Sequence, residues 1–561
     1  MTRPVELSHR TRSKNLALLG SETYDLLVIG GGITGAGVAR DAALRGLSVG
    51  LVERRDFASG TSSRSSKLIH GGLRYLQQGD VGLVREAATE RYTLRKLAPH
   101  LARPMEMMVP TYSRRGHAKI SVGLWTFDRI ASVSDQERYR MLSRDEALEF
   151  EPLLRSDNLQ GAGVYWECVT DDARLVLEVL KSAAALGVVI ANHVEAAGFL
   201  LENDQIAGVR LRDCFSGDET VARGRVVINA AGPWVDAVRL LSEHGEKPRL
   251  RLTKGIHVGI PRERVGVSRI VVMNARDKRS VFAVPRGAVT YLGTTDTDYA
   301  QPEEYPFITA DDVDYLIDAA NRTFSVEELT QADVVSAWAG LRPLLHQEGK
   351  NPSELSRKDE IMFSRTGLVS IAGGKLTTFR RMSERVVDIA CERLKEQGRS
   401  APAALGTSAE TSLSGGETGE DVEGYARRLE KRWPRVGAAI VQRLVEVYGS
   451  NAERIVEGMS ADPVLAERLG SGPPVTRAEV EYAMREEMAM TLVDFLERRS
   501  RLLLWDPDNG LAVAEGAART MGAVLGWDAA RVREEVASYR AHVESVKSFQ
   551  SEPETPQAAH A

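Results

Sequence analysis

Residues 24–53 read YDLLVIGGGITGAGVARDAALRGLSVGLVE, and this stretch decides the fold. An apolar run of strand length ends in glycines, a segment with helical spacing follows, and a second apolar run ends at Glu53. A strand, a helix and a strand within about thirty residues normally build a parallel sheet. The turn between the first strand and the helix carries the spacing Gly30-x-Gly32-x-x-Gly35, which is typical of dinucleotide-binding loops.

Each glycine of this motif has a specific structural role. Gly30 permits a tight turn, Gly32 lets a pyrophosphate approach the backbone, and Gly35 lets the helix pack closely on the strand. The helix N-terminus offers free N–H groups to the anion, and Glu53 can accept hydrogen bonds from a ribose. We therefore predict dinucleotide binding over a purely structural turn. The motif does not distinguish NAD from FAD.

Composition bounds the class of protein. At 561 residues the chain has room for about three or four domains. A formal net charge of −5 argues against a dedicated nucleic-acid binder. Three widely spaced cysteines exclude a disulfide framework and a thiolate zinc site, which suits a reducing cytoplasm, and we expect no metal. The start of the chain has no secretory signal, and no uncharged apolar run reaches the about 20 residues of a membrane span.

A second stretch, residues 61–75 with the sequence TSSRSSKLIHGGLRY, follows the Glu53 strand. By composition alone it is a flexible serine-rich loop. Its small residues and backbone amides are also suited to packing against a flat ring, with Arg74 pointing into a pocket.

These stretches resemble the FAD-dependent glycerol-3-phosphate dehydrogenases, within the wider group of amino-acid-oxidase-like flavoproteins. Further matches, in family order, extend the resemblance over residues 24–380. They are TDDARL at 170–175, NAAGPW at 229–234, KGIH at 254–257, GTTD at 293–296, GLRPL at 340–344 and GGKLTT at 373–378. One departure is Ala231, where the family often has Thr, which leaves one hydrogen bond on the flavin side open.

The resemblance implies an α/β fold with added helices. We expect a Rossmann-like FAD-binding domain, an inserted antiparallel-sheet substrate domain and a helical C-terminal cap domain. Short β runs between residues 256 and 295, a Ser/Gly/Pro-rich break and amphipathic helical spacing at Val475–Ser500 agree with this. The predicted segments are a flexible tail (1–22), the FAD-binding domain (23–97, 165–250 and 340–397), the substrate domain (98–164 and 251–339), a linker (398–421), the helical domain (422–550) and a second tail (551–561).

The resemblance also implies the reaction and the site. The protein would oxidise sn-glycerol 3-phosphate to dihydroxyacetone phosphate, with hydride transfer to flavin N5, as an enzyme of glycerol metabolism. Arginine suits the phosphate because its planar fork donates two hydrogen bonds. The implied substrate-binding residues are Arg74, Tyr75, Lys254, Arg342, Arg357 and Lys375. The implied cofactor-binding residues are Gly30, Gly32, Ile33, Thr34, Gly35, Glu53, Thr61, Ser62, Ser63, Ser65, Lys67, Leu68, His70, Gly71, Gly72, Leu73, Ala230, Gly232, Trp234, Gly340, Gly374, Lys375, Leu376 and Thr377.

The implied catalytic residues are His257, Arg342 and Lys375. An imidazole suits proton abstraction near neutral pH, so His257 is the predicted general base, although a lone histidine is often structural. Arg342 is the rival, as polariser of the substrate hydroxyl. Which of the two handles the proton stays open, and His70 is expected to orient the loop.

The electron acceptor also stays open. Relatives in bacteria are peripheral membrane enzymes that reduce quinone, and we expect the same here, on the inner face of the cytoplasmic membrane. The alternatives are an oxidase that reduces O₂ to H₂O₂, an amino-acid-oxidase-like enzyme and a non-enzymatic dinucleotide sensor. Residues 113–130 join a basic segment to an apolar, aromatic one, which fits either an anionic membrane surface or a helix packed on the core. A homodimer is compatible with the sequence.

Overall fold

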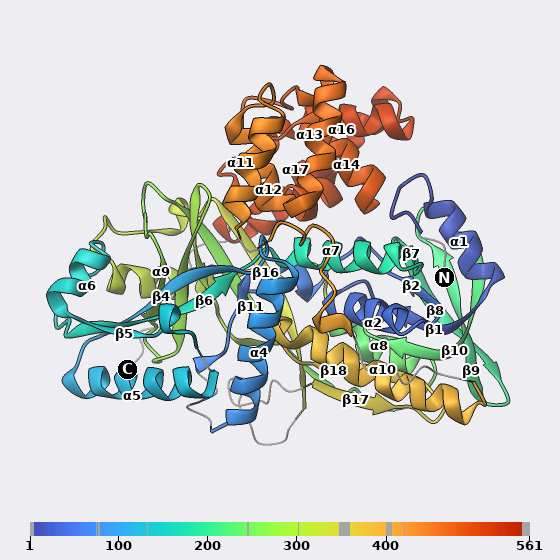
Figure 1. Ribbon diagram of the computed structural model, residues 1–561, viewed down its shortest axis with the longest axis horizontal. Helices are drawn as coiled ribbons and strands as arrows, with labels where there is room; N and C mark the ends of the chain where they lie inside the picture. Colours follow the sequence, from blue (N-terminus) through green and yellow to red (C-terminus); the bar gives the residue numbers. More distant parts are fainter. Residues whose placement is uncertain are drawn as a thin grey trace.

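The computed structural model describes residues 5–73, 76, 79–131, 133–243, 246–300, 302–346, 359–399, 407–419 and 421–551. Within these residues two β-sheets lie side by side, and the helices of the last quarter of the chain form a layer of their own above them (Figure 1). This arrangement confirms the predicted fold class.

The first sheet contains the stretch at residues 24–53 near its centre. Strand β1 (Thr23–Ile29), helix α2 (Ile33–Leu44) and strand β2 (Val49–Val52) form the predicted unit, and β1 pairs with β2 in parallel. The strand order is β17 (Asp359–Phe363), β18 (Val369–Gly373), β10 (Glu219–Asn229), β1, β2 and β7 (Val189–Ala191), with β9 (Gln205–Asp213) beside β10 and β8 (Val194–Glu202) beside β9.

Helices cover one face of this sheet and strands the other. Helix α2 packs between α7 (Asp172–Ala185) and α10 (Phe379–Glu396), and all three contribute to the largest apolar core. The β8–β9 hairpin closes the second face together with α1 (Arg12–Ser21). Both faces are therefore buried, which explains why the second half of β1 (Leu26–Ile29) and all of β2 are apolar rather than alternating.

Helix α1 corrects the sequence prediction, which placed it in a flexible tail. The Arg12 guanidinium lies 2.8 Å from the Asp213 carboxylate and also donates to the backbone carbonyl of Asn192. Leu19 is completely buried against Tyr24. The partners of α1 lie far away in the sequence, so a short polar segment gave no local sign that it would be ordered.

The second sheet is mostly antiparallel, as predicted. Its order is β15 (Thr297–Tyr299), β11 (Leu250–Pro261), β14 (Val289–Gly293), β13 (Ser280–Arg286), β12 (Ile270–Asn274), β4 (Arg103–Thr111), β6 (Gly161–Val169) and β3 (Leu68–Ile69), with β16 (Ser336–Leu345) beside β11 and β5 (Arg140–Ser143) beside β6. Strand β16 continues to Leu345 and β3 belongs to this sheet, whereas the predicted division placed 340–345 and 68–69 with the first domain. Alternating apolar residues identify a strand but not the sheet that it joins.

Four helices surround the second sheet. Helices α6 (Arg144–Phe150) and α9 (Ala310–Thr323) share an apolar core with β11 and β12. Helix α4 (Val81–Leu97) packs on α5 (Arg114–Ala131), and α5 packs on β4 and β6. Within the part of the chain that the structure describes, no helix is long and apolar enough to span a membrane.

The C-terminal layer is helical, as predicted. It consists of α11 (Val422–Arg432), α12 (Ala438–Tyr448), α13 (Ala452–Ala461), α14 (Arg477–Glu487), α15 (Leu502–Trp505), α16 (Leu511–Leu525) and α17 (Ala529–Val546). The helical spacing at 475–500 corresponds to two pieces, because α14 ends before Met488, whose φ of 51° lies in the left-handed region, and a π-helical turn follows at Asp494–Arg499. In the predicted linker, Leu413 N–H donates to the Leu97 carbonyl, while residues 400–406 and 420 lie outside the described residues, as does the second tail from 552 on.

Candidate active site

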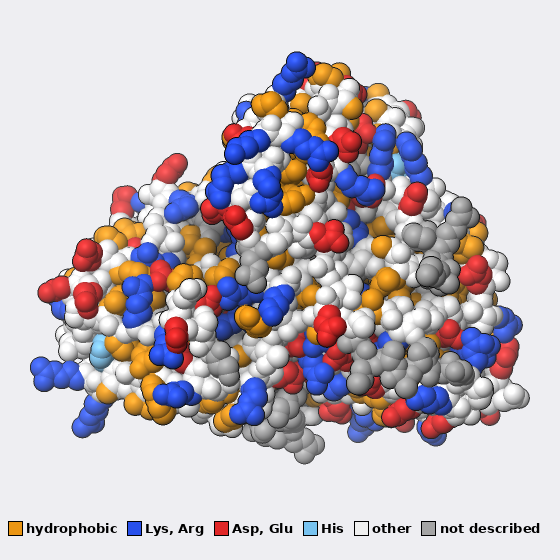
Figure 2. Space-filling model, viewed as in Figure 1, with side chains coloured by type: hydrophobic (Ala, Val, Ile, Leu, Met, Phe, Trp, Pro, Cys, Tyr) orange, Lys and Arg blue, Asp and Glu red, His pale blue; other side chains and the backbone are white. Residues whose placement is uncertain are grey.

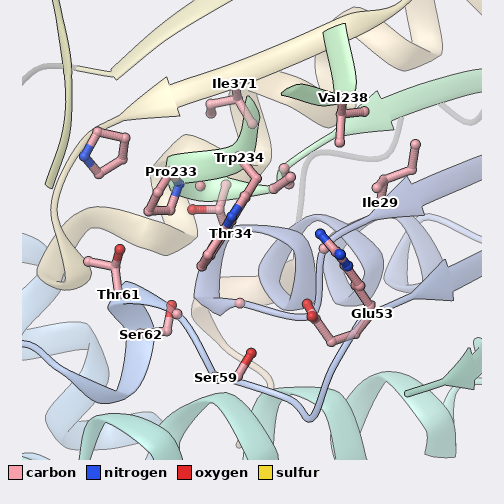
Figure 3. A pocket seen from close by; sticks show the side chains of 18 of the residues that line it. Ile29, Thr34, Glu53, Ser59, Thr61, Ser62, Pro233, Trp234, Val238 and Ile371 are labelled. Atoms are coloured by element: carbon pink, nitrogen blue, oxygen red, sulfur yellow. The ribbon is translucent and has the colours of Figure 1, made fainter. Parts of the chain in front are cut away.

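A cleft of about 470 Å³ opens at the carboxyl ends of β1 and β2, where sheets of this kind bind dinucleotides. Its walls come from the start of α2, the serine-rich loop, the turn after β10 and the turn after β18. Figure 3 shows Thr61 and Ser62 on one side of the cleft, Trp234 on the other and Glu53 at one end.

The three motif glycines serve different purposes. Gly30 has a φ of 112°, which favours glycine. A Cβ on Gly35 would lie 1.9 Å from the Gly30 carbonyl oxygen, so Gly35 is required by the chain itself. A Cβ on Gly32 would meet only Ser62 Oγ, at 3.1 Å, and would project at the cleft. Gly32 therefore leaves room for a ligand against the N-terminus of α2, which attracts anions.

Glu53 ties the second strand to the glycine loop. Its carboxylate accepts hydrogen bonds from the N–H of Gly31 (2.7 Å) and the N–H of Arg55 (2.9 Å). Burial raises the pKa of the Glu53 carboxyl above its usual value. The same side chain lines the cleft, at the position where an acidic residue meets a ribose in this type of loop.

The serine-rich loop joins the cleft to the second sheet. Ser62 Oγ accepts from the Ile33 N–H (2.9 Å), and Thr61 Oγ1 donates to the Leu341 carbonyl (2.6 Å) on β16. Farther along, Ser65 N–H and Oγ–H both donate to Asp172. The predicted flexible alternative is thus wrong for residues 61–67, because hydrogen bonds hold them to α2, to β16 and to α7.

Most of the predicted cofactor residues border this cleft. Those that line it are Gly30, Gly32, Ile33, Thr34, Glu53, Thr61, Ser62, Ser65, Ala230, Gly232, Trp234, Gly374, Lys375 and Leu376. Those that do not are Gly35, Ser63, Lys67, Leu68, His70, Gly71, Gly72, Leu73, Gly340 and Thr377. Lys67 donates instead to Asp172 (2.8 Å) and to the Ser63 carbonyl (2.7 Å), and the Thr377 hydroxyl accepts from the His70 N–H (3.2 Å). These side chains support the walls from behind.

Sequence reasoning missed other lining residues. The principal ones are Arg54, Arg55, Ser59, Val194, Glu195, Ala196, Arg212, Val238, Leu241, Pro343 and Ile371. The segment at 194–197 carries no motif, and it reaches the cleft only because β7 pairs with β2. The run Arg54-Arg55 directly after Glu53 was the one local signal available.

Two predicted catalytic residues, His257 on β11 and Arg342 on β16, lie on one face of this strand pair, and neither lines the cleft itself. A Cβ on Gly255 would lie 2.2 Å from an Arg342 guanidinium nitrogen, and a Cβ on Gly293 would lie 1.9 Å from the His257 ring. Side chains at 255 and 257 point to the same face because strands alternate with a period of two. The Arg342 guanidinium and the His257 ring therefore occupy the space that these two glycines leave.

Arg342 is held in place by hydrogen bonds. Its guanidinium donates to Asp296 Oδ1 (3.0 Å), Thr294 Oγ1 (3.0 Å) and the Thr295 carbonyl (3.1 Å). The Arg342 side chain keeps 18% of its surface exposed.

His257 is buried and neutral. Its ring stacks on Trp338, with centroids 4.9 Å apart, and Nε2 lies 2.9 Å from Ser66 Oγ. Burial, together with the positive charges of Lys67 and Arg342, holds the pKa of the imidazole well below 6.5. Nδ1 has no hydrogen-bond partner among the described residues.

Four other predicted residues are placed differently or not at all. Lys254 donates to Asp312 (2.6 Å) and the Phe307 carbonyl (2.7 Å), which binds β11 to α9. Arg74, Tyr75 and Arg357 lie outside the described residues.

Comparison with known proteins agrees with this site. Residues 25–380 match the family model described as FAD dependent oxidoreductase, and residues 407–532 match that of the C-terminal domain of alpha-glycerophosphate oxidase. The glycine cradle, the helix N-terminus and the Glu53 carboxylate fit that cofactor. The fold and the site thus define a FAD-dependent oxidoreductase.

The relatives are more specific. The chain is 41% identical to an aerobic glycerol-3-phosphate dehydrogenase of Bacillus subtilis, over 89% of this chain and 91% of that one. It is 40% identical to the enzyme of that name from Staphylococcus aureus, over 92% and 93% of the two chains. The crystal structure of a glycerol-3-phosphate dehydrogenase from Bacillus halodurans complexed with FAD aligns with a TM-score of 0.81 at 35% identity, over 98% of this chain and all of that one. The chain belongs to the family of FAD-dependent aerobic glycerol-3-phosphate dehydrogenases.

Replacing Gly32 with Val tests the cofactor position. We expect a folded protein without flavin, because the branched side chain would fill the space against the helix N-terminus and meets little else. Absorbance near 450 nm measures flavin content, and thermal unfolding reports the fold. Gly123→Val is the matched control, since no atom lies within 4 Å of an added Cβ there. A yellow Gly32→Val protein with full flavin content would contradict the assignment.

Proposed function

We propose that this protein oxidises sn-glycerol 3-phosphate to dihydroxyacetone phosphate and passes the electrons to a membrane quinone. The observation that carries the proposal is the placement of the Arg342 guanidinium and the neutral His257 ring on one face of the β11–β16 strand pair, in a chain of a FAD-dependent family. Arg342 is next in the chain to Pro343, which lines the cleft. An arginine fork suits a phosphate dianion or a substrate hydroxyl, and a neutral imidazole can accept a proton.

FAD held in this cleft would supply the hydride acceptor, at its N5 atom. Lys375, which lines the cleft, and Arg342 bind the anionic substrate and orient its C2 hydrogen. His257 Nδ1 takes the proton of the C2 hydroxyl, so that one hydride and one proton leave the alcohol and a ketone remains. Ser66 and Trp338 hold the imidazole in place during this transfer.

Anaerobic mixing with sn-glycerol 3-phosphate tests the reaction. Bleaching of the flavin absorbance is expected, whereas glycerol, which lacks the phosphate, should leave it unchanged. Reoxidation then separates the two acceptors. A soluble naphthoquinone should restore the colour faster than air, and rapid reoxidation by O₂ with stoichiometric H₂O₂ would favour an oxidase instead.

Helix α5 supports contact with lipid. Val122 and Trp125 keep 65% and 52% of their surface exposed, while Leu124 is buried against the sheet. The basic residues Arg114, Arg115 and Lys119 are exposed on the first turns. Figure 2 shows Lys and Arg side chains projecting over this helix next to hydrophobic ones. We propose that α5 rests on the anionic inner face of the cytoplasmic membrane, where quinone is found.

Arg342→Lys should damage catalysis more than folding. Lysine keeps the charge, but it loses the fork that binds Asp296, Thr294 and a ligand together. We expect kcat/KM for flavin reduction to fall about 100-fold with flavin content unchanged. Arg264→Lys, which alters an ion pair with Asp333 at the edge of the same sheet, is the control. A rate within about threefold of the parent would leave Arg342 without a special role.

His257→Gln tests the proton acceptor. The amide can still accept a hydrogen bond from the substrate, but it cannot take up a proton. We expect the limiting rate of flavin reduction to fall about 100-fold or more, with the half-saturating substrate concentration little changed. Stopped-flow reduction over a substrate titration measures both quantities. A variant that loses affinity and keeps the limiting rate would instead make His257 a binding residue.

Replacing Arg114, Arg115 and Lys119 with Gln should weaken binding to anionic vesicles by about 1 kcal/mol per residue, or about fivefold each. Co-sedimentation with vesicles containing phosphatidylglycerol measures this. The control removes three charges elsewhere, at Arg427, Arg432 and Arg454, which are similarly exposed on the C-terminal layer. Equal losses in both variants, or no binding by the parent, would refute the docking site.

A further inference from the structure

Three arginines of the C-terminal layer are almost completely buried. Arg498 and Arg499 end the π-helical turn, and Arg501 precedes α15. Their exposed fractions are 2%, 0% and 2%. Burying a charged group is costly unless the group is paired. The acidic partners of these arginines therefore indicate which segments the π-helical turn connects.

Arg498 and Arg499 bind the segment that wraps the glycine loop. Arg498 Nε donates to Asp56 Oδ2 (2.6 Å), and Arg499 binds the same carboxylate through both terminal nitrogens. Two residues farther on, Ala58 N–H donates to the Gly31 carbonyl (3.1 Å). The helical layer therefore reaches the pyrophosphate end of the cleft through Asp56.

Arg501 reaches the other end of the cleft. Its Nη2 donates to Asp172 Oδ1 (3.1 Å), which also accepts from Lys67 Nζ (2.8 Å). The second oxygen of Asp172 accepts from the N–H (3.1 Å) and the hydroxyl (2.8 Å) of Ser65. Asp172 is fully buried, so this carboxylate fixes the Ser65–Lys67 corner from one side and Arg501 fixes the carboxylate from the other.

The same corner holds the proposed proton acceptor. Ser66 Oγ lies 2.9 Å from His257 Nε2, and the Ser66 carbonyl accepts from the Tyr291 hydroxyl (2.9 Å). The Ser65 carbonyl accepts from the Trp338 indole (3.2 Å), and Trp338 is the ring on which His257 stacks. A displacement of Asp172 would therefore be passed to His257 through Ser65 and the adjacent Ser66.

We propose that Arg501 is a positioning residue for the redox site, acting through Asp172 on the Ser65–Lys67 corner and thereby on His257. The helical layer is then a working part of the active site and not only a cover. The proposal rests on the proposed function in its use of glycerol 3-phosphate as reductant.

The charges around Lys67 make its pKa depend on Arg501, which a pH profile can detect. Lys67 faces Asp171 and Asp172 on α7, Arg501 before α15 and His257 on β11. Burial and the Arg501 charge lower the pKa of Lys67 to about 8, against the opposing effect of the two aspartates. Without Arg501 the pKa of Lys67 rises, so the Lys67–Asp172 pair survives to higher pH.

A metal site was the competing interpretation for part of this region. Asp56, His193 and Asp494 carry potential ligand atoms within 4.8 Å of one another. Arg498 bridges the two carboxylates, at 2.6 Å from Asp56 and 2.9 Å from Asp494. The Arg498 guanidinium already supplies the positive charge that a metal ion would bring. We therefore interpret the cluster as an ion-pair network and not as a metal site.

The test compares Arg501→Met, Arg501→Lys and Arg443→Met in the full-length holoenzyme. Arg443 is the matched control, because this largely buried arginine pairs with Glu479 inside the helical layer and reaches no cofactor residue. Flavin content, thermal unfolding and the pH profile of flavin reduction are measured for each protein.

For Arg501→Met we expect the limiting rate of reduction to fall about tenfold with the half-saturating substrate concentration changed less than about threefold. From the lowered pKa of Lys67 we expect an alkaline limb near pH 8 in the parent, and in Arg501→Met this limb should move up by about one pH unit. Arg501→Lys should bring the limb back towards that of the parent. Arg443→Met should unfold at a lower temperature with the profile unchanged.

An unchanged rate and alkaline limb in Arg501→Met would overturn the proposal, as would the same limb shift in Arg443→Met. If Arg501→Met does not fold, the charge-preserving Arg501→Lys decides, because loss of the ion pair between Arg501 Nε and Asp171 (3.5 Å) should still lower the limiting rate. The near-ultraviolet and visible circular dichroism of bound flavin gives a readout without substrate. If glycerol 3-phosphate fails to reduce even the parent, the proposed function fails, and a changed flavin dichroism in Arg501→Met alone would still support the positioning role.

Discussion

One carboxylate, that of Asp172, joins helix α7, the serine-rich loop and the C-terminal helical layer. It is the second residue of the Asp171-Asp172 pair at the start of α7, and it binds Ser65 and Lys67 of the serine-rich loop and Arg501 of the helical layer. A fully buried carboxylate is stable only when its oxygens accept hydrogen bonds. The loss of any one of these donors would therefore leave a buried negative charge incompletely paired. This carboxylate therefore fixes the Ser65–Lys67 part of the cofactor loop from both sides.

Much of the fold and of the cofactor site could be predicted from the sequence, because their signals are local. The β1–α2–β2 unit, the roles of Gly30 and Gly32 and the position of Glu53 follow from spacing within 30 residues. The β-α-β unit could be recognised because buried parallel strands are continuous apolar runs and the glycine turn has a fixed spacing. The lining residues at 230–234 and 374–376 were implied by the family resemblance and not by local spacing.

The rest depends on contacts between distant segments. Nothing around Arg12 indicates Asp213, and nothing around Lys254 indicates that Asp312 will bind it. The same limit explains why Lys67 was predicted to bind the cofactor, although its ammonium pairs with Asp172 behind the loop. Charge-bearing side chains in a motif have partners that only the folded chain brings together, so their roles were the least predictable part of the site.

Gly255 and Gly293 are important because they have no side chain. Neither has a positive φ or lines the cleft. The space that a Cβ would need is taken by the Arg342 guanidinium at Gly255 and by the His257 ring at Gly293. In a deep mutational scan both positions would rank with the reactive residues themselves, and alanine would be as damaging as larger residues. A map of tolerated substitutions would therefore outline the reaction centre partly through residues that never contact a ligand.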